Sequence, residues 1–177
     1  MEPALGTWEA IDSIRVVRSF AGDPLTPAEL DRILNAGRRT GSSKNRQRWA
    51  FVVVRDRVRL AGLAAVGPFA GHLAGAAAAI ALVTPDPRGP DEPLSIMFDL
   101  GRAAQNMVLA AWELGIGSVP ATVYDQPLVR RLLALPAGMH CEYLLSFGRP
   151  ADEAALTAPN RPGGRKPLAE IAHQEGW

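Results

Sequence analysis

Two arginines near the amino terminus have a spacing that suits an anion site. Arg15 and Arg18 are three residues apart, so on one helical turn both guanidinium groups can point to the same side. A guanidinium group binds phosphate through paired hydrogen bonds, which makes the two residues a candidate phosphate site. A solvated basic edge would carry the same residues, because exposed charges contribute little to stability. The pair alone leaves both interpretations open.

The other side chains that could carry chemistry are scattered. His72, His140 and His173 lack the spacing of a metal-binding helix, and Cys141 is the only cysteine. The sequence contains neither the Gly-x-Ser-x-Gly turn of a serine hydrolase nor the Gly-x-Gly-x-x-Gly of a dinucleotide-binding fold. We therefore predict no metal centre, no hydrolytic triad and no Rossmann site.

The composition is that of an ordinary globular chain. Hydrophobic residues make up 47% of the 177 residues and charged residues 21%, with a net charge of +1, which gives no argument for nucleic acid or membrane as a partner. A chain of this length fits a single domain. The apolar run over residues 73–83 is too short to cross a bilayer, and the first residues lack the pattern of a secretory signal. We expect a cytoplasmic protein.

The arginine pair must be positioned by the elements around it. Apolar spacing predicts a short helix over residues 8–14 that runs into the two arginines. Residues 26–29, Thr-Pro-Ala-Glu, have the form of a capping box, which predicts a helix over residues 27–38. Residues 40–48 are polar and lack periodicity, so we expect a loop that leads into a strand over residues 49–54.

The longest periodic pattern predicts a central helix over residues 95–114. It has a broad apolar stripe on one face. The opposite face carries Asp99, Arg102, Asn106 and Glu113. Further helices are expected over residues 57–66 and after Asp125, and strands over residues 78–84, 118–123 and 142–147, while residues 67–77 fit a helix or a loop.

The end of the chain differs from the body. After residues 148–150, Gly-Arg-Pro, the sequence is rich in Ala, Pro and Gly, which favours an extended path. We expect one domain over residues 1–177, with residues 151–177 as an extended arm. Trp8, Trp49 and Trp112 lie in apolar patterns, so we expect them in the core or in an interface.

Several motifs, taken in order, resemble those of the nitroreductase (NADH oxidase/flavin reductase) family. Residues 15–20, Arg-Val-Val-Arg-Ser-Phe, resemble the family's Arg-Arg-Ser-x-Arg-x-Phe. Residues 41–49, Gly-Ser-Ser-Lys-Asn-Arg-Gln-Arg-Trp, resemble its Pro-Ser-x-x-Asn-x-Gln-Pro-Trp. The similarity continues through residues 99–106, 114–118, 148–150 and 164–168, so it covers nearly the whole chain.

This resemblance implies a fold and a cofactor. The fold is α+β, with a central mixed but mainly antiparallel sheet flanked by helices, in a homodimer with a swapped terminal arm. FMN is bound non-covalently between the subunits. By position, the residues that match the family's phosphate site are Arg15, Val16, Arg18, Arg165 and Lys166. Val16 replaces a common Ser, so one hydroxyl contact to FMN is lost or replaced.

Two further segments match positions beside the flavin ring. Ser43, Asn45 and Gln47 match a loop whose amide side chains hydrogen-bond the pyrimidine edge. Thr122 and Val123 match a turn whose backbone N–H groups face flavin N5 and O4. An ordinary polar loop and a plain edge strand are the alternatives.

Arg46 and Arg48 depart from the family pattern, the latter at a position where Pro is common. Their positive charge favours an anionic substrate or a phosphorylated electron donor. The sequence does not distinguish between NADH and NADPH as that donor.

The activity implied by the resemblance is hydride transfer from NAD(P)H through FMN to a nitroaromatic, a quinone or a similar small acceptor. The chemistry is flavin-based, and we assign no catalytic side chain. The stretch between residue 49 and the central helix is short, so we expect an open, shallow site without a lid. The alternatives are a flavin-binding protein without turnover and a deazaflavin-linked or oxygen-using, flavin-modifying member of the same fold.

Overall fold

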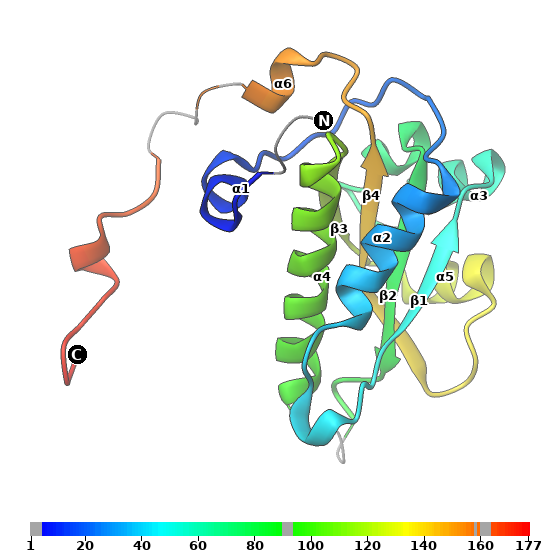
Figure 1. Cartoon of the computed structure of the whole chain (residues 1–177). Helices are drawn as coiled ribbons and strands as arrows, with labels where there is room; N and C mark the ends of the chain where they lie inside the picture. The colour runs from blue at the N-terminus through cyan, green and yellow to red at the C-terminus, as the bar shows by residue number, and fades with distance from the viewer. Residues whose placement is uncertain (1–4, 90–93, 158, 160–163) are drawn as a thin grey trace.

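A four-stranded antiparallel sheet forms the centre of the fold (Figure 1). The computed structural model describes residues 5–89, 94–157, 159 and 164–177. The strands are β1 (Ala50–Val54), β2 (Ala78–Pro85), β3 (Gly117–Thr122) and β4 (Met139–Gly148), in the order β1-β2-β4-β3. Within the described residues, parallel pairing is limited to an isolated bridge between Val16 and Ser118. The expected, mainly antiparallel sheet is therefore confirmed, and all the pairings between its four strands are antiparallel.

Helices cover both faces of this sheet (Figure 1). One face packs against α2 (Pro27–Arg38) and α4 (Ser95–Glu113), and the other against α3 (Arg57–Leu63), α5 (Gln126–Leu133) and the 3-10 turn η2 (Gly71–Gly75). The central strand β2 is buried at all positions except the last. Such a strand lies between two apolar layers, which explains its continuous apolar sequence.

Local signals fix the helix boundaries that the sequence predicts. The backbone N–H of Thr26 donates to the Glu29 carboxylate at 2.8 Å, and that of Glu29 donates to the Thr26 hydroxyl at 3.3 Å. The capping box is therefore confirmed, and the Thr26 backbone contact holds the pKa of Glu29 below its ordinary value. Asp125 caps α5 through the Leu128 N–H at 2.8 Å.

The tryptophans take three different environments. Trp112 is buried, and its indole N–H donates to the Ser13 hydroxyl at 2.9 Å, which joins α4 to α1 (Thr7–Ser13). Trp49 is half-buried. Trp8 is 77% exposed, so a core position is wrong for this residue, and an interface position stays a prediction.

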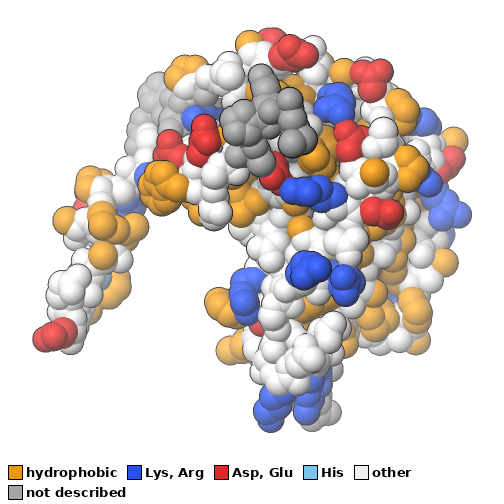
Figure 2. All heavy atoms as spheres, in the orientation of Figure 1, with side chains coloured by type: hydrophobic (Ala, Val, Ile, Leu, Met, Phe, Trp, Pro, Cys, Tyr) orange, Lys and Arg blue, Asp and Glu red, His pale blue; other side chains and the backbone are white. Residues whose placement is uncertain are grey.

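The carboxyl-terminal arm stands away from the body (Figures 1 and 2). It contains the short helix α6 (Ala154–Thr157) and the 3-10 turn η3 (Leu168–Glu170), and residues 160–163 lie outside the described part. Every residue from 164 to 177 is exposed, including the large apolar residues Leu168, Ile171 and Trp177. None of the described helices is long and apolar enough to cross a membrane.

Candidate functional site

The predicted site residues lie in three separate regions of the chain. Arg15, Val16, Arg18, Thr122 and Val123 lie along the outer edge of β3. Ser43, Asn45 and Gln47 lie in the loop before β1, around the 3-10 turn η1 (Ser43–Asn45). Arg165 and Lys166 lie in the exposed arm.

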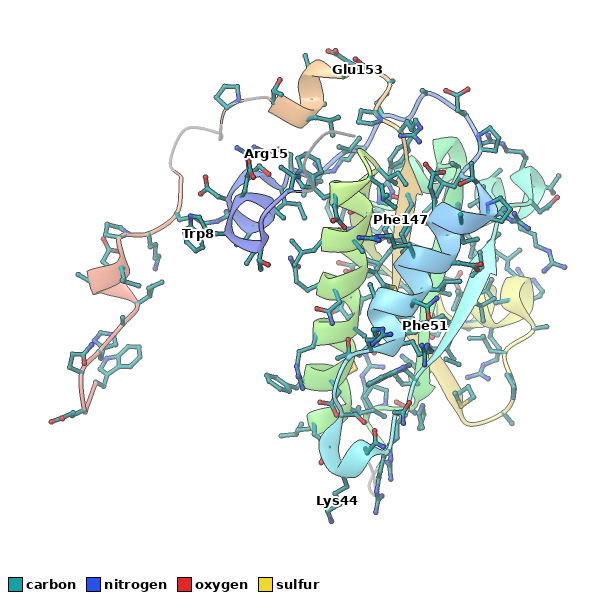
Figure 3. All side chains as sticks on the ribbon, in the orientation of Figure 1. Trp8, Arg15, Lys44, Phe51, Phe147 and Glu153 are labelled. Carbon is teal, nitrogen blue, oxygen red and sulfur yellow. The ribbon has the colours of Figure 1, made fainter. Side chains whose placement is uncertain are left out.

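The helix α4 sets the distance between the first two regions. Near its carboxyl end, Trp112 contacts Ser13, next to the arginine pair. Near its amino end, Asp99 contacts Ser43. These thirteen positions span about 20 Å at the helical rise of ~1.5 Å per residue. Figure 3 shows the same separation, with Arg15 beside one end of α4 and Lys44 at the other. One copy of the chain therefore does not bring its predicted site residues together.

The first region is built by adding residues 16–18 to the edge of β3. The Val17 N–H donates to the Ser118 carbonyl at 3.1 Å. The Val17 side chain fills the space where a Cβ atom at Gly117 would lie, with its own Cβ only 2.5 Å from that position. This close approach requires glycine. It leaves Val16 54% exposed and directs Arg18 to a groove that is lined by Pro68, Phe69, Gly71, His72 and Pro120.

Arg15 and Arg18 are in different situations. The Arg15 side chain is half-buried, and its Nη1 donates to the carbonyls of Asp12, Ser13 and Ile14 at 3.0, 2.7 and 3.0 Å. Carbonyls at the end of a helix lack partners within the helix, so Arg15 caps α1. Arg18 is exposed at the groove. The structure therefore gives Arg15 a structural role, and its phosphate contact stays a prediction.

Of the two backbone N–H groups at the end of β3 that were predicted to face the flavin, one points out of the sheet. The Val123 side chain is buried, and its N–H donates to the Glu142 carbonyl at 2.9 Å. Because N–H groups alternate in direction along a strand, that of Thr122 points away from β4, towards the open edge. Thr122 is also exposed. The Thr122 N–H therefore has the direction that a contact to the flavin ring requires. The Val123 N–H is instead hydrogen-bonded within the sheet.

The second region, the loop before β1, has a constrained backbone. Lys44, Asn45 and Gln47 have positive φ angles of 52°, 53° and 47°, a conformation that costs about 1 kcal/mol or more for each residue with a side chain. The Gln47 N–H donates to the Ser42 hydroxyl at 2.9 Å, and the Gln47 amide donates to the Asn45 side-chain oxygen at 3.1 Å. The two predicted amide side chains therefore hold each other in place.

The polar face of α4 anchors this loop. The Asp99 carboxylate accepts the Ser43 N–H at 2.8 Å. About one turn further along, Arg102 donates to the Gly41 carbonyl at 3.1 Å, and about two turns along, Asn106 donates to the Thr40 hydroxyl at 2.7 Å. Asp99 is only 7% exposed, although it lies on the polar face of α4. Its burial follows from its use as an acceptor for the loop backbone.

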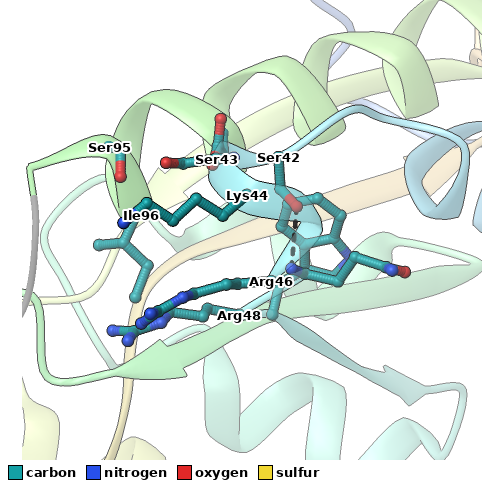
Figure 4. Close-up of a pocket in the computed structure, with 10 residues that line it drawn as sticks. Ser42, Ser43, Lys44, Arg46, Arg48, Ser95 and Ile96 are labelled. Atoms are coloured by element: carbon teal, nitrogen blue, oxygen red, sulfur yellow. Dashed lines mark hydrogen bonds between the residues drawn. The ribbon is translucent and has the colours of Figure 1, made fainter.

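The loop and the amino end of α4 enclose a cavity of about 270 Å³. Its lining comprises Ser42, Ser43, Lys44, Arg46, Gln47, Arg48, Trp49, Ser95, Ile96 and Asp99. Figure 4 shows the Arg46 and Arg48 side chains running side by side in the same direction. Asn45 is absent from this lining, although it neighbours two residues that belong to it.

Comparison with known proteins identifies the family of this chain. The profile of the nitroreductase family matches residues 11–74 and 67–149. The chain belongs to the nitroreductase family. It is 34% identical over 144 residues to an Archaeoglobus fulgidus protein named "Putative NADH dehydrogenase/NAD(P)H nitroreductase", covering 78% of this chain and 82% of the relative.

Solved structures agree with that assignment. A Parabacteroides distasonis protein of the same name superposes with a TM-score of 0.81 at 28% identity, covering 97% of this chain and 98% of the other. The NADPH:FMN oxidoreductase of Vibrio harveyi, solved in complex with NAD+, gives a TM-score of 0.83 at 26% identity, covering 97% of this chain and 77% of the other. The α+β nitroreductase fold is confirmed.

In this nitroreductase-family chain, His72 lines the candidate groove, a position that the sequence did not indicate. Its Nδ1 lies 2.9 Å from the Ser146 hydroxyl, whereas its Nε2 is buried without a hydrogen-bond partner among the described residues. Burial and, second, the charge of Arg18 hold the pKa of His72 below its ordinary value, which favours the neutral ring. The sequence shows only an isolated histidine in an apolar stretch, because η2 brings it to Arg18 through tertiary packing.

The groove at the β3 edge is open, as expected from the short stretch of chain between residue 49 and the central helix. Between β1 and α4 the described residues form only α3, η2 and β2, so no additional helix lies there as a lid. Phe69, at the rim of the groove, is 76% exposed. An exposed aromatic side chain beside an exposed guanidinium group suits a ligand that carries both an aromatic system and an anion.

Proposed function

We propose that this chain is an FMN-dependent oxidoreductase that takes hydride from NAD(P)H and passes the electrons to a small acceptor such as a nitroaromatic or a quinone. Membership of the nitroreductase family supports the reaction class and the cofactor. The named activity of the Vibrio harveyi neighbour points the same way. The observation in this chain that carries the proposal is the groove at the β3 edge, where Arg18, Phe69 and His72 meet.

The residues of this groove fit FMN. Arg18 supplies a fixed positive charge for the phosphate or for the electron-rich side of the reduced ring. The Thr122 N–H points to the open edge and can donate to the ring system. The pKa of His72 is held below its ordinary value, chiefly by burial, so the ring adds no second positive charge beside Arg18. Bound FMN would supply the hydride chemistry itself.

We further propose that two copies of the chain complete each site as a homodimer. The β3 edge of one copy would meet the loop before β1 of the other, since α4 holds these regions about 20 Å apart within a single copy. The exposed apolar residues of the arm support this arrangement, because large apolar side chains in solvent often mark an association surface. Arg165 and Lys166 lie in this arm and would reach the phosphate from the neighbouring copy.

Two measurements test the proposed function. Mass spectrometry of the small molecule released from the purified protein should give the mass of FMN. Anaerobic stopped-flow mixing of the loaded protein with NADH and NADPH should then bleach the flavin absorbance within seconds. If the bound FMN stays oxidised with both donors, the protein is a flavin-binding protein without turnover. Val16, which stands where a serine is common in the family, would be consistent with that outcome. Absence of any flavin would overturn the proposal.

A further inference from the structure

The cavity at the amino end of α4 is strongly basic. Lys44, Arg46 and Arg48 line it, and Asp99 is the acid among its described lining residues. The Asp99 carboxylate already accepts the Ser43 N–H at 2.8 Å and lies 3.7 Å from Arg102. Its charge is therefore directed at the loop backbone and at Arg102. The three basic residues, which we call the basic cluster, leave the cavity with a positive potential.

The loop backbone fixes the position of the basic cluster. Lys44 is itself a positive-φ residue, and Asn45 and Gln47, on either side of Arg46, are the other two in this loop. Strained backbone conformations persist only when surrounding contacts hold them, and they concentrate at ligand-binding sites. Here the contacts come from Asp99 and Ser42. The basic side chains are therefore attached to a backbone segment of fixed conformation, which lowers the entropic cost of binding a ligand.

The remaining lining suits a phosphorylated ligand. Ser42, Ser43 and Ser95 add hydroxyl groups, and the half-buried Trp49 adds an aromatic surface. Figure 2 shows Lys and Arg side chains gathered at this lower end of the molecule. A phosphate monoester carries about 1.5 to 2 negative charges at neutral pH and three acceptor oxygens. Such a group gains more from two or three nearby cations than an uncharged hydroxyl does.

We propose that the basic cluster binds the 2′-phosphate of NADPH and makes NADPH the preferred electron donor over NADH. The inference rests on the proposed function, because it assigns the donor to the same composite site. In that site the loop of one copy faces the groove of the other. NADH has a hydroxyl where NADPH has the phosphate, so the cluster discriminates between the two donors while leaving hydride transfer itself unchanged.

The test compares two charge-matched variants. Lys44→Gln/Arg46→Gln removes two cations from the cluster, whereas Arg59→Gln/Arg131→Gln removes two exposed cations from α3 and α5, on the opposite face of the sheet. Anaerobic stopped-flow titration gives the dissociation constants of NADPH and NADH for each loaded protein. Calorimetry with adenosine 2′,5′-bisphosphate and with adenosine 5′-monophosphate gives a measure of phosphate recognition that needs no turnover.

The unmodified protein should bind NADPH at least about tenfold more tightly than NADH at low salt, and the preference should shrink as salt rises. Lys44→Gln/Arg46→Gln should reduce the preference to about one, and Arg59→Gln/Arg131→Gln should retain it. Equal binding of both donors by the unmodified protein, or an unchanged preference in the cluster variant, would overturn this inference. Bisphosphate binding without flavin reduction would instead contradict the proposed function and leave the phosphate site standing.

Discussion

The two ends of α4 position their neighbours by different means. At the carboxyl end, the segment that carries the arginine pair is held by packing, with Val17 against Gly117 and the buried Trp112 against Ser13. At the amino end, the loop before β1 is held by hydrogen bonds to a few polar side chains, chiefly Asp99. The first arrangement is sensitive to side-chain volume, and the second to the loss of a single acceptor. Substitutions at the two ends of α4 should therefore destabilise the protein by different amounts.

Gly117→Ala should have the largest effect, because the added Cβ would lie 2.5 Å from the Val17 side chain. Overpacking of this kind costs about 1–3 kcal/mol, and we expect the upper end of that range because a Cβ carbon next to the backbone cannot swing aside. Urea unfolding measures the loss, and FMN affinity should fall with it as residues 16–18 separate from β3. Gly75→Ala is the control, since a Cβ there meets nothing within 4 Å. Equal stability of the two variants would contradict the packing account.

Asp99→Ala should cost about 2 kcal/mol, the typical contribution of a hydrogen bond to a charged group. The Ser43 N–H loses its acceptor, so hydrogen exchange at this amide should speed up, and the positive-φ loop should relax. Asp99→Asn keeps an acceptor oxygen and should lose less. Exchange that stays slow in Asp99→Ala would show that the loop holds its conformation without α4.

His72 should make stability depend on pH below neutrality. Its pKa in the folded protein is lower than in the unfolded chain, so the unfolded chain binds more protons as the pH falls. The stabilisation is therefore present above the unfolded pKa of about 6.5 and is lost progressively below it. The free energy of unfolding, measured between about pH 7.5 and pH 5, should fall more steeply for the unmodified protein than for His72→Gln. Parallel curves would contradict the assignment.

Cys141 should show no reactivity in the folded protein. Burial raises the pKa of its thiol to about 12, so almost no thiolate is present at pH 8, and the side chain is inaccessible. A thiol reagent such as DTNB should detect no thiol in the native protein and a single thiol after unfolding. Rapid labelling of the native protein would show that β4 opens locally.

The body of the fold could be predicted from the sequence because its signals are local. The capping box at Thr26 and Glu29 and the apolar period of α4 set helix boundaries that the structure confirms. The exposure of Trp8 and the burial of Asp99 do not follow from the sequence pattern, because both depend on which segments pack together. Apolar or polar character alone does not tell whether another segment packs on that face.

The candidate site was less accessible to sequence reasoning than the fold. The resemblance located Arg18 and Thr122, which the structure places at the open edge of β3. It did not reveal that Arg15 caps α1 or that His72 lies beside Arg18, because both facts depend on contacts between distant segments or on side-chain direction. The proposed contribution of a second copy rests on the separation of the two regions along α4, which becomes visible only in the folded chain.

Subunit mixing tests the central proposal, a cofactor site shared between two copies, most directly. Arg18→Gln removes the groove cation, and Asn45→Ala/Gln47→Ala removes the loop amides, so each variant alone should bind FMN weakly. After unfolding and refolding together, a mixed dimer would contain one site with both groups intact. About a quarter of all sites should then bind FMN with the original affinity, as expected for random pairing of two chains. If the mixture binds no better than the separate variants, the site lies within one copy and the account is wrong.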